Sequence, residues 1–514
     1  MSIMKKLSAF SPVPILAGCL LFLTGCAPYI SSLDPEKGTV GSYVVIEGGN
    51  FGASPAENTV KFGDISVPVG DISVLSEKKL KVRVPSGAHT GKVSVITSKG
   101  TGISSSNFIA DTANEAKWTF MVYLDADNNL EGAGIDDFLE MAEVGSRNGV
   151  NIVVQIDRRA GYSTAYGDWK DTRRFLINNG SNPSGEPIQN MGELNMGDPA
   201  TLSDFVEWAV TNYPAEHYAL SVWNHGDGWR MSRMKMDTIM SAMPRGEQEP
   251  ILKAVASDDT DNDILFMREV QDALSAARER LEARNITNAK IDVLGFDACL
   301  MGMVEVAYAF RNEADFMTGS EELEPGEGWP YNIILEGLTD NPGMAPADLA
   351  KLIVTCYGNT YTNEVTQAAY DIGRVTDLAI KIDEFTGQAI NGWDVIKSAR
   401  INSRQYHPAW DQGCWGTDIW DFADRVYRNS SYPTIKNAAA ELKSAVESFV
   451  IQEFHSSDMS GSHGVAIYFP PDLNSFNNDP QHAGYEQTNT FMKVDFVSNH
   501  QFDEWLKKYY SKIP

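Results

Sequence analysis

Trp118-Thr119-Phe120-Met121-Val122-Tyr123-Leu124 is a continuous run of large, mostly apolar side chains. Similar runs follow at residues 151–156, 218–223 and 291–296, and stretches with helical periodicity such as 267–283 lie between them. A strand without polar alternation is buried on both faces, and helices between such strands cover a parallel sheet. The pattern predicts an α/β domain with a mostly parallel sheet flanked by helices, which we place at residues 117–514.

The chain before this domain has the pattern of an all-β fold. Short segments alternate in polarity and are separated by Gly, Pro, Asn and Ser; they lie at residues 43–46, 59–62, 80–84 and 91–95. Such short strands at regular spacing predict a small sandwich. Residues 100–116, which are rich in Ser, Thr and Asn, are expected to form a linker.

Four short motifs in this region are similar to those of an IPT/TIG immunoglobulin-like domain. They are PEKGTVG at 35–41, IEGGNFG at 46–52, VKFG at 60–63 and Val84-Pro85. On this resemblance we place the domain at residues 27–110. The resemblance implies a stalk or binding module that carries no chemistry of its own.

Composition limits the function. With 514 residues the chain is too long for one ordinary domain, and its 43% hydrophobic and 22% charged residues are typical of globular proteins. The formal net charge of −27 argues against binding DNA or RNA through a basic surface. We therefore expect no nucleic-acid partner.

The first 25 residues have the features of a targeting segment. Lys5 and Lys6 precede an apolar run at 13–23, which is too short to span a bilayer as a mature helix. The run ends in Leu23-Thr24-Gly25-Cys26 and resembles a bacterial lipoprotein signal peptide. The resemblance implies cleavage before Cys26, lipidation of Cys26, and a protein anchored by lipid to the bacterial cell envelope, on the outer membrane or cell surface. The alternative is an ordinary secretory signal in which Cys26 is incidental.

Five cysteines are present, and no Cys-x-x-Cys spacing occurs among them. Cys19 would leave with the signal segment and Cys26 would carry lipid. The remaining three, Cys299, Cys356 and Cys414, are an odd number, so at least one thiol stays unpaired within the chain. Cys356 lies in a helical apolar pattern typical of a protein core. A disulfide between Cys356 and Cys414 is possible, but no pattern in the sequence supports it.

Two residues suited to nucleophilic catalysis follow neighbouring strands of the predicted sheet. His225 comes directly after the run at 218–223, and Cys299 after the run at 291–296. Carboxyl ends of parallel strands meet at one edge of a sheet, so the two side chains are expected to share a cleft. A thiolate can attack a carbonyl carbon, while an imidazole accepts the proton of the thiol and donates a proton to the leaving amine.

The residues around this pair suit the same chemistry. Cys299 precedes a predicted helix at 304–310, whose dipole would favour the thiolate. Gly226 leaves room for a substrate to approach the backbone, and the amides of Gly226 and Cys299 could form an oxyanion hole. The alternative to catalysis is that Cys299 is a core residue and His225 a hydrogen-bonded polar residue. Buried cysteines and such histidines are each common in proteins.

Six further motifs resemble the clostripain family of cysteine peptidases, in the same broad clan as caspases. They run in family order: MVYLDADNNLE at 121–131, NMGDP at 195–199, WNHGDGW at 223–229, GFDACLM at 295–301, SEELEPGEGWPY at 320–331 and VAIYFP at 465–470. The resemblance implies a caspase-like fold, with His225 as the acid and base and Cys299 as the nucleophile.

The same resemblance implies a preference for basic substrates. Asp297 matches the family position in the pocket for the residue before the scissile bond, where a carboxylate would pair with Arg or Lys. The alternative is that Asp297 caps the following helix. Glu327, in the loop Pro325-Gly326-Glu327-Gly328-Trp329, is a weaker candidate for the pocket rim. His463 also precedes a glycine, but it lies at the amino end of its strand, so we rank it below His225.

Two acidic stretches, at 125–129 and 258–263, are rich in the oxygen ligands that calcium prefers. Neither follows the EF-hand spacing, and a solvated loop is the expectation for the second. The peptidase chemistry itself requires no cofactor. Some members of the family need calcium, so calcium binding by one of these stretches is kept as an alternative.

The Met-rich segment 231–250 carries Arg233, Lys235 and Arg245. It is either a site of self-cleavage, as in relatives, or a flexible lid.

Taken together, these residues predict a lipid-anchored cysteine endopeptidase. It would hydrolyse peptide bonds after Arg or Lys in protein or peptide substrates. Two rivals remain: a degenerate surface-binding lipoprotein that has lost catalysis, and a related peptidase with a different pocket preference.

Overall fold

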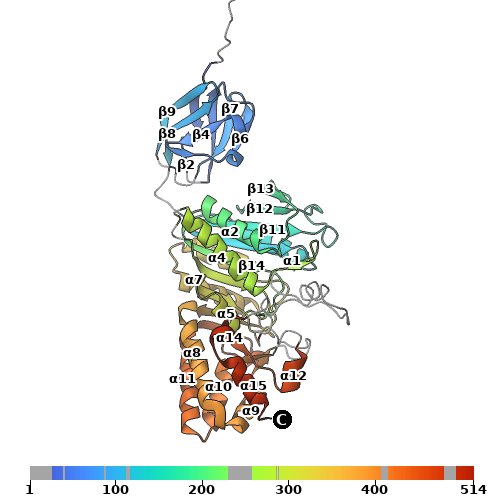
Figure 1. Ribbon diagram of the computed structural model, residues 1–514. Helices are drawn as coiled ribbons and strands as arrows, with labels where there is room; N and C mark the ends of the chain where they lie inside the picture. Colours follow the sequence, from blue (N-terminus) through green and yellow to red (C-terminus); the bar gives the residue numbers. More distant parts are fainter. Residues whose placement is uncertain are drawn as a thin grey trace, which may run out of the picture. The chain divides into compact units, whose positions relative to one another are not determined.

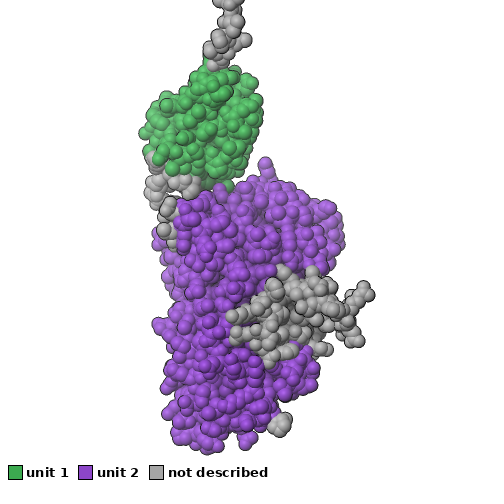
Figure 2. Space-filling model, viewed as in Figure 1, with its two compact units in different colours: residues 1–112 green, residues 113–514 purple. Residues whose placement is uncertain are grey.

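The computed structural model describes residues 26–38, 41–85, 88, 90–110, 116–229, 257–284, 286, 289–406, 415–479, 485 and 494–513. The chain forms two compact units, residues 1–112 and 113–514 (Figure 2). The predicted signal segment 1–25, the whole segment 231–250 and Cys414 lie outside the described residues.

The first unit is a β-sandwich (Figure 1). One sheet has the order β1-β3-β7-β6 and the other β2-β9-β8-β4-β5. Alternate side chains such as Val44, Ile46, Val82 and Val93 point into the core between them. The strands are β1 (Tyr29–Asp34), β2 (Lys37–Gly38), β3 (Tyr43–Gly49), β4 (Thr59–Phe62), β5 (Ile65–Ser66), β6 (Ile72–Ser76), β7 (Lys79–Arg83), β8 (Gly91–Thr97) and β9 (Gly100–Ala110).

The expected linker at 100–116 is wrong over most of its length. Residues Gly100–Ala110 form β9, the longest strand of the sandwich, which pairs with β8. Ser104 and Phe108 are buried on this strand, and the Ser104 hydroxyl accepts a hydrogen bond from the Val93 amide at 3.0 Å. Small polar side chains resemble a linker in composition, but here Ser104 is hydrogen-bonded inside the core.

The second unit is built on a nine-stranded sheet with the order β13-β12-β11-β10-β14-β17-β18-β19-β22. The central strands from β11 to β18 run parallel, and the outer ones pair antiparallel. The strands are β10 (Ala116–Ala126), β11 (Val150–Arg158), β12 (Thr172–Leu176), β13 (Gln189–Gly192), β14 (Ala215–Trp223), β17 (Ile291–Asp297), β18 (Ala314–Gly319), β19 (Thr366–Asp371) and β22 (Val450–His455). The predicted α/β fold is confirmed.

Helices cover both faces of this sheet. Met121 and Tyr123 of β10 belong to the core under α2 (Pro199–Asn212), α4 (Met267–Ala283) and α5 (Val304–Ala309). Phe120 and Val122 belong to the core under α1 (Glu131–Val144), α6 (Tyr331–Asp340) and α7 (Pro346–Thr360). Because successive strand residues point to opposite faces, the whole run is apolar.

The carboxyl-terminal part adds helices and a small sheet. The sheet has the order β20-β21-β23. Its strands and the longer helices are β20 (Gln405–Tyr406), β21 (Gly416–Asp418), β23 (Ala466–Tyr468), α8 (Val375–Gln388), α9 (Trp393–Asn402), α10 (Ile419–Asn429), α11 (Pro433–Phe449) and α15 (Phe502–Tyr510). Each helix in the described part of the chain is too short or too polar to cross a bilayer.

Candidate active site

The carboxyl ends of β14 and β17 open into one pocket. The two strands pair in parallel, with Trp223 opposite Asp297, and the Asn224 amide donates to the Asp297 carbonyl at 3.3 Å. The pocket has a cavity volume of about 130 Å³. Its lining residues are Leu130, Trp223, Asn224, His225, Asp297, Ala298, Cys299, Glu324, Pro325, Gly326 and Gly328. The structure therefore brings His225 and Cys299 to the wall of the same pocket, as their positions after neighbouring strands suggested.

The loop after β10 lies against His225. Nε2 of His225 is 3.0 Å from Oδ1 of Asn129. The neighbouring Asn224 donates from Nδ2 to the Asp125 carbonyl at 2.8 Å. Sequence reasoning did not single out Asn129 as a partner of the imidazole, although it lies in the motif at 121–131. Its amide can orient the ring from the side of β10.

Cys299 lies in a turn and not at a helix end. Helix α5 begins at Val304, and its N-cap is Met303. Burial raises the pKa of the Cys299 thiol to about 12, although the Glu324 amide donates to Sγ at 3.2 Å. The expectation that a helix dipole favours the thiolate is therefore wrong, because desolvation of the charged sulfur outweighs the local donors.

Gly226 is required by the contact between the two strand ends. A Cβ built on Gly226 would lie 2.1 Å from the Cys299 carbonyl oxygen and 2.7 Å from its nitrogen. No side chain fits at that distance. The sequence suggested that this glycine leaves space for a substrate; the structure shows that the backbone of Cys299 itself occupies the space.

Three carboxyl groups converge around the pocket. Asp297 is buried, accepts from the Trp329 amide at 3.2 Å and has a pKa raised by burial to about 6. Burial and the nearby Asp297 raise the pKa values of Glu324 and Asp137 well above the usual range. Glu324 accepts from Nε2 of Gln367 at 2.9 Å, and Asp137 accepts from Nε1 of Trp223 at 2.6 Å.

Asp297 ends strand β17, whereas the N-cap of the following helix is Met303, so the capping alternative for Asp297 is wrong. Glu327 is exposed and does not belong to the pocket lining. Glu324, in the same motif, does line the pocket, but sequence reasoning did not select it. His463 stacks on Trp420 with ring centroids 4.0 Å apart and is not among the lining residues.

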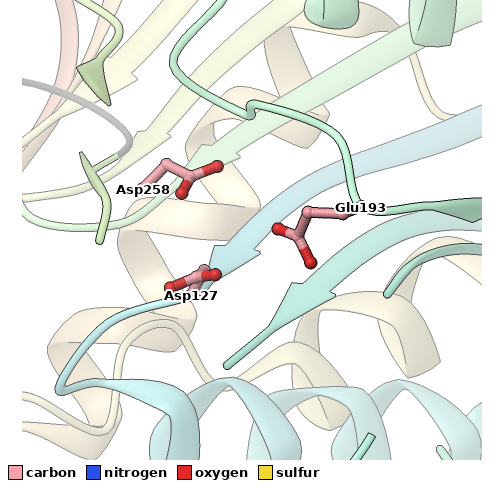
Figure 3. Close-up of side chains that lie close together, drawn as sticks. All are labelled: Asp127, Glu193 and Asp258. Carbon is pink, nitrogen blue, oxygen red and sulfur yellow. The ribbon is translucent and has the colours of Figure 1, made fainter. Parts of the chain in front are cut away.

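The two acidic stretches meet in space. Asp127 follows β10, and Asp258 lies in the short strand β15 (Ser257–Asp258), where it is fully buried. Together with Glu193 they form a group that could hold a metal ion (Figure 3). Burial raises the pKa of Asp258 to about 6 and that of Glu193 to about 7. The expectation of a solvated loop at 258–263 is wrong for Asp258.

Cys356 is buried in α7, as its helical pattern predicted. Its possible disulfide partner, Cys414, lies outside the described residues. Among the cysteines that the structure describes, Cys299 is the one that lines the pocket.

Comparison with known proteins identifies the family of the chain. Residues 122–509 match the model of the clostripain family, and residues 28–108 match that of the IPT/TIG domain. The chain belongs to the clostripain family. Both family resemblances are thereby confirmed, and the chain is a cysteine-type endopeptidase that acts on peptide or protein substrates.

The chain is 26% identical to clostripain from Hathewaya histolytica over 436 residues, which cover 72% of this chain and 76% of that protein. A secreted C11 cysteine protease from Bacteroides thetaiotaomicron, solved with an irreversible peptide inhibitor, is 21% identical with a TM-score of 0.53. That match covers 76% of this chain and 99% of the other. A second such structure from the same organism, iotapain, is 15% identical with a TM-score of 0.51 and covers 74% of this chain and 99% of its own. These structures support the caspase-like fold of the clostripain family.

Proposed function

We propose that the chain hydrolyses peptide bonds after Arg or Lys, with Cys299 as nucleophile and His225 as acid and base. The observation that carries the proposal is one pocket lined by His225, Cys299 and the carboxyl groups of Asp297 and Glu324. A thiol and an imidazole supply covalent catalysis. Carboxylates in the same pocket would pair with a cationic side chain of the substrate.

The proposed reaction forms and then hydrolyses a thioester on Cys299. His225 takes the Cys299 proton as Sγ attacks the carbonyl carbon, and then gives it to the leaving amine as the C–N bond breaks. A water molecule next hydrolyses the thioester and restores the thiol. The amides of Gly226 and Cys299 would stabilise the oxyanion, each contributing roughly 3 kcal/mol to the transition state.

The substrate's basic side chain would lie against Asp297 and Glu324. Burial raises the pKa of both carboxyl groups, and the nearby Asp297 raises that of Glu324 further. An arriving guanidinium or ammonium group would stabilise their charged forms. Glu327 was proposed for the pocket rim. Glu327 is exposed and does not line the pocket, although it lies in the same loop as Glu324. We therefore use it as a control for substitutions of the binding residues.

We further propose that the enzyme is presented at a bacterial cell envelope by lipid on Cys26. Cys26 is an exposed free cysteine at the start of the described residues. One of the similar proteins is a secreted protease. The hydrolysis itself needs no cofactor in this scheme.

Fluorogenic arginyl, lysyl and aspartyl substrates test the proposal. Cys299→Ala and His225→Ala should each lower kcat/KM at least roughly a thousandfold. Cys356→Ala is the matched control, since that thiol is buried in α7 and outside the pocket, and it should retain most of the activity.

The substrate preference has its own controls. Asp297→Asn and Glu324→Gln should lower kcat/KM for arginyl substrates at least about tenfold, whereas Glu327→Gln should leave it within about twofold. A preference for aspartyl substrates, or full activity in Cys299→Ala, would overturn the proposal.

A further inference from the structure

Glu321 lies between two residues whose carbonyl groups hold the turn after β17. The Leu300 amide donates to the carbonyl of Glu322 at 3.1 Å, and the Gly302 amide donates to the carbonyl of Ser320 at 2.7 Å. This turn carries the proposed nucleophile, and the φ of 63° at Leu300 is a conformation that persists only when the surrounding structure supports it. The position of residue 321 therefore affects the position of the sulfur.

The side chain of Glu321 meets a second carboxyl group in the interior of the domain. Glu321 and Asp418 of β21 are both buried. Their carboxyl groups are hydrogen-bonded to each other, and the Tyr406 hydroxyl donates to Oδ2 of Asp418 at 3.3 Å. Two ionised carboxylates offer only acceptors, so the contact between Glu321 and Asp418 requires that one of them carries a hydrogen.

The donors around the pair favour a charge on Asp418 and the hydrogen on Glu321. Oδ1 of Asp418 accepts from the Asp421 amide at 2.6 Å, and its Oδ2 accepts from the His463 amide, also at 2.6 Å. On Glu321, Oε2 accepts from the Gly464 amide at 3.1 Å. Its Oε1 is buried and accepts no hydrogen bond from the residues that the structure describes. N–H donors stabilise a carboxylate, whereas burial with fewer of them favours the neutral acid.

We propose that Glu321 is a positioning residue that acts as a neutral acid and donates its hydrogen to Asp418. This hydrogen bond joins the segment after β18 to β21 of the small sheet. A second link lies beside it, since the Ala466 amide of β23 donates to the Gly302 carbonyl at 2.9 Å. The small sheet thereby fixes the turn that carries Cys299, and the effect on catalysis rests on the proposed role of Cys299 as nucleophile.

The electrostatic surroundings agree with this assignment. Burial and the charge of Asp418 raise the pKa of Glu321 well above its usual range. His463 can become a cation, but its Nδ1 lies 3.4 Å from Oδ1 of Asp418, so it stabilises the charge on Asp418 and not one on Glu321. The other titratable groups that face Glu321 are Tyr406 on β20, Tyr370 on β19, Glu453 on β22 and Asp227, which lines the same small cavity.

The pH dependence of stability tests where the hydrogen lies, without involving cleavage. Because the folded state raises the pKa of Glu321 above the value of about 4.3 for an unfolded Glu, its contribution to stability is complete below that pH and decreases as the pH rises toward the folded-state pKa. Glu321→Gln keeps a donor and does not titrate. In calorimetric melting of the full chain in a Cys299→Ala background, its melting temperature relative to the parent should therefore rise by at least about 3 °C between pH 5 and pH 8. A constant or falling difference would show that Glu321 is ionised and would overturn the proposal.

Steady-state kinetics with an arginyl substrate test the positioning role. Glu321→Gln should keep kcat within about threefold of the parent, because its amide can donate to Asp418. Glu321→Ala removes the donor and should lower kcat at least about thirtyfold with KM changed less than about threefold, because the turn at Cys299 shifts while the pocket for the basic side chain stays.

Two kinetic results would contradict the positioning role. One is an unchanged kcat in Glu321→Ala. The other is a thirtyfold loss in Glu321→Gln, which still decides the matter if the alanine variant folds poorly. Failure of the proposed function would look different, as full activity in Cys299→Ala, and would leave the melting result in place.

Glu453→Gln is the matched control. It removes a carboxylate whose charge also acts on Glu321, but Glu453 is half-buried on β22, and its Oε2 lies 2.9 Å from Nδ1 of His455. Its melting temperature relative to the parent should change by less than about 1 °C between pH 5 and pH 8, and kcat should stay within about twofold. A response equal to that of Glu321→Gln would mean that any lost negative charge has this effect, and the assignment to Glu321 would be wrong.

Discussion

Asp297 occupies a buried position where its ionisation decides whether the pocket carries a negative charge. Its pKa is raised by burial from 3.8 to about 6. The charged form therefore predominates above about pH 6, and the neutral acid predominates below it. A basic substrate side chain would lose its ion pair as the pH falls through this range.

The consequence is a pH-dependent selectivity. The ratio of kcat/KM for an arginyl over a citrullyl substrate should fall about tenfold between pH 7 and pH 5, because citrulline has nearly the same shape without the charge. Protonation of the catalytic base affects both substrates and cancels in the ratio. Stopped assays across this range measure it. The ratio should be low and flat in Asp297→Asn, and a flat ratio in the parent enzyme would contradict the role of Asp297.

Cys299 illustrates how burial changes the reactivity of a residue. Because its pKa is raised to about 12, the thiol is protonated at neutral pH in the resting enzyme. Under the proposed mechanism, the proton must leave as Sγ attacks, with His225 receiving it. The sequence alone favoured a preformed thiolate, because it showed a following helix but not the depth of the sulfur.

At the scale of elements, the site depends on how tightly the ends of β14 and β17 pack. The turn after β14 passes so close to the turn after β17 that Gly226 has no room for a Cβ. The turn after β17 contains Leu300, whose φ of 63° is rare for a residue with a side chain. These two turns place His225 and Cys299, so their packing shapes the proposed active site.

A pair of glycine substitutions tests this packing. Gly226→Ala should push the Cys299 backbone away, lowering kcat/KM at least about a hundredfold and the free energy of unfolding by about 1–3 kcal/mol. Gly132→Ala is the matched change: it lies in helix α1 with nothing within 4 Å of its Cβ position. It should leave kcat/KM unchanged and stabilise the fold by about 0.5–1 kcal/mol. Denaturant unfolding and steady-state kinetics measure both effects; equal behaviour of the two variants would contradict the packing argument.

At the scale of the whole molecule, a sandwich unit precedes the peptidase unit, and the sandwich begins just after Cys26. The core residues of the sandwich form their own cluster, separate from the two cores that flank the peptidase sheet. Each unit thus has its own hydrophobic interior, as expected of independent domains. The residues that line the pocket all belong to the second unit.

Membrane attachment is predicted to depend on one residue. Cys26→Ser should move the expressed protein from the detergent phase to the aqueous phase in a detergent phase-partition experiment, because acyl chains supply the anchor. Cys299→Ala should stay in the detergent phase and serves as the control for loss of a cysteine. Recovery of the unaltered protein in the aqueous phase would contradict lipidation.

The strand and helix pattern of the peptidase unit was readable in the sequence because apolar runs and their spacing are local properties. Residues 118–124, 218–223 and 291–296 all lie within the strands of the central sheet. The order of polar residues after those strands was enough to select His225 and Cys299, whereas the selection of Asp297 came from the family resemblance. The serine-rich strand β9 was missed because its composition is that of a linker and only its pairing shows it to be core.

Tertiary structure alone decided which distant residues meet and how much water reaches them. Glu324, Asn129 and the group of Asp127, Glu193 and Asp258 are assembled from segments that are far apart in the chain. The raised pKa of Cys299 likewise follows from burial. Proximity across a parallel sheet and desolvation are properties of the packed chain, so neither is encoded in any local stretch of residues.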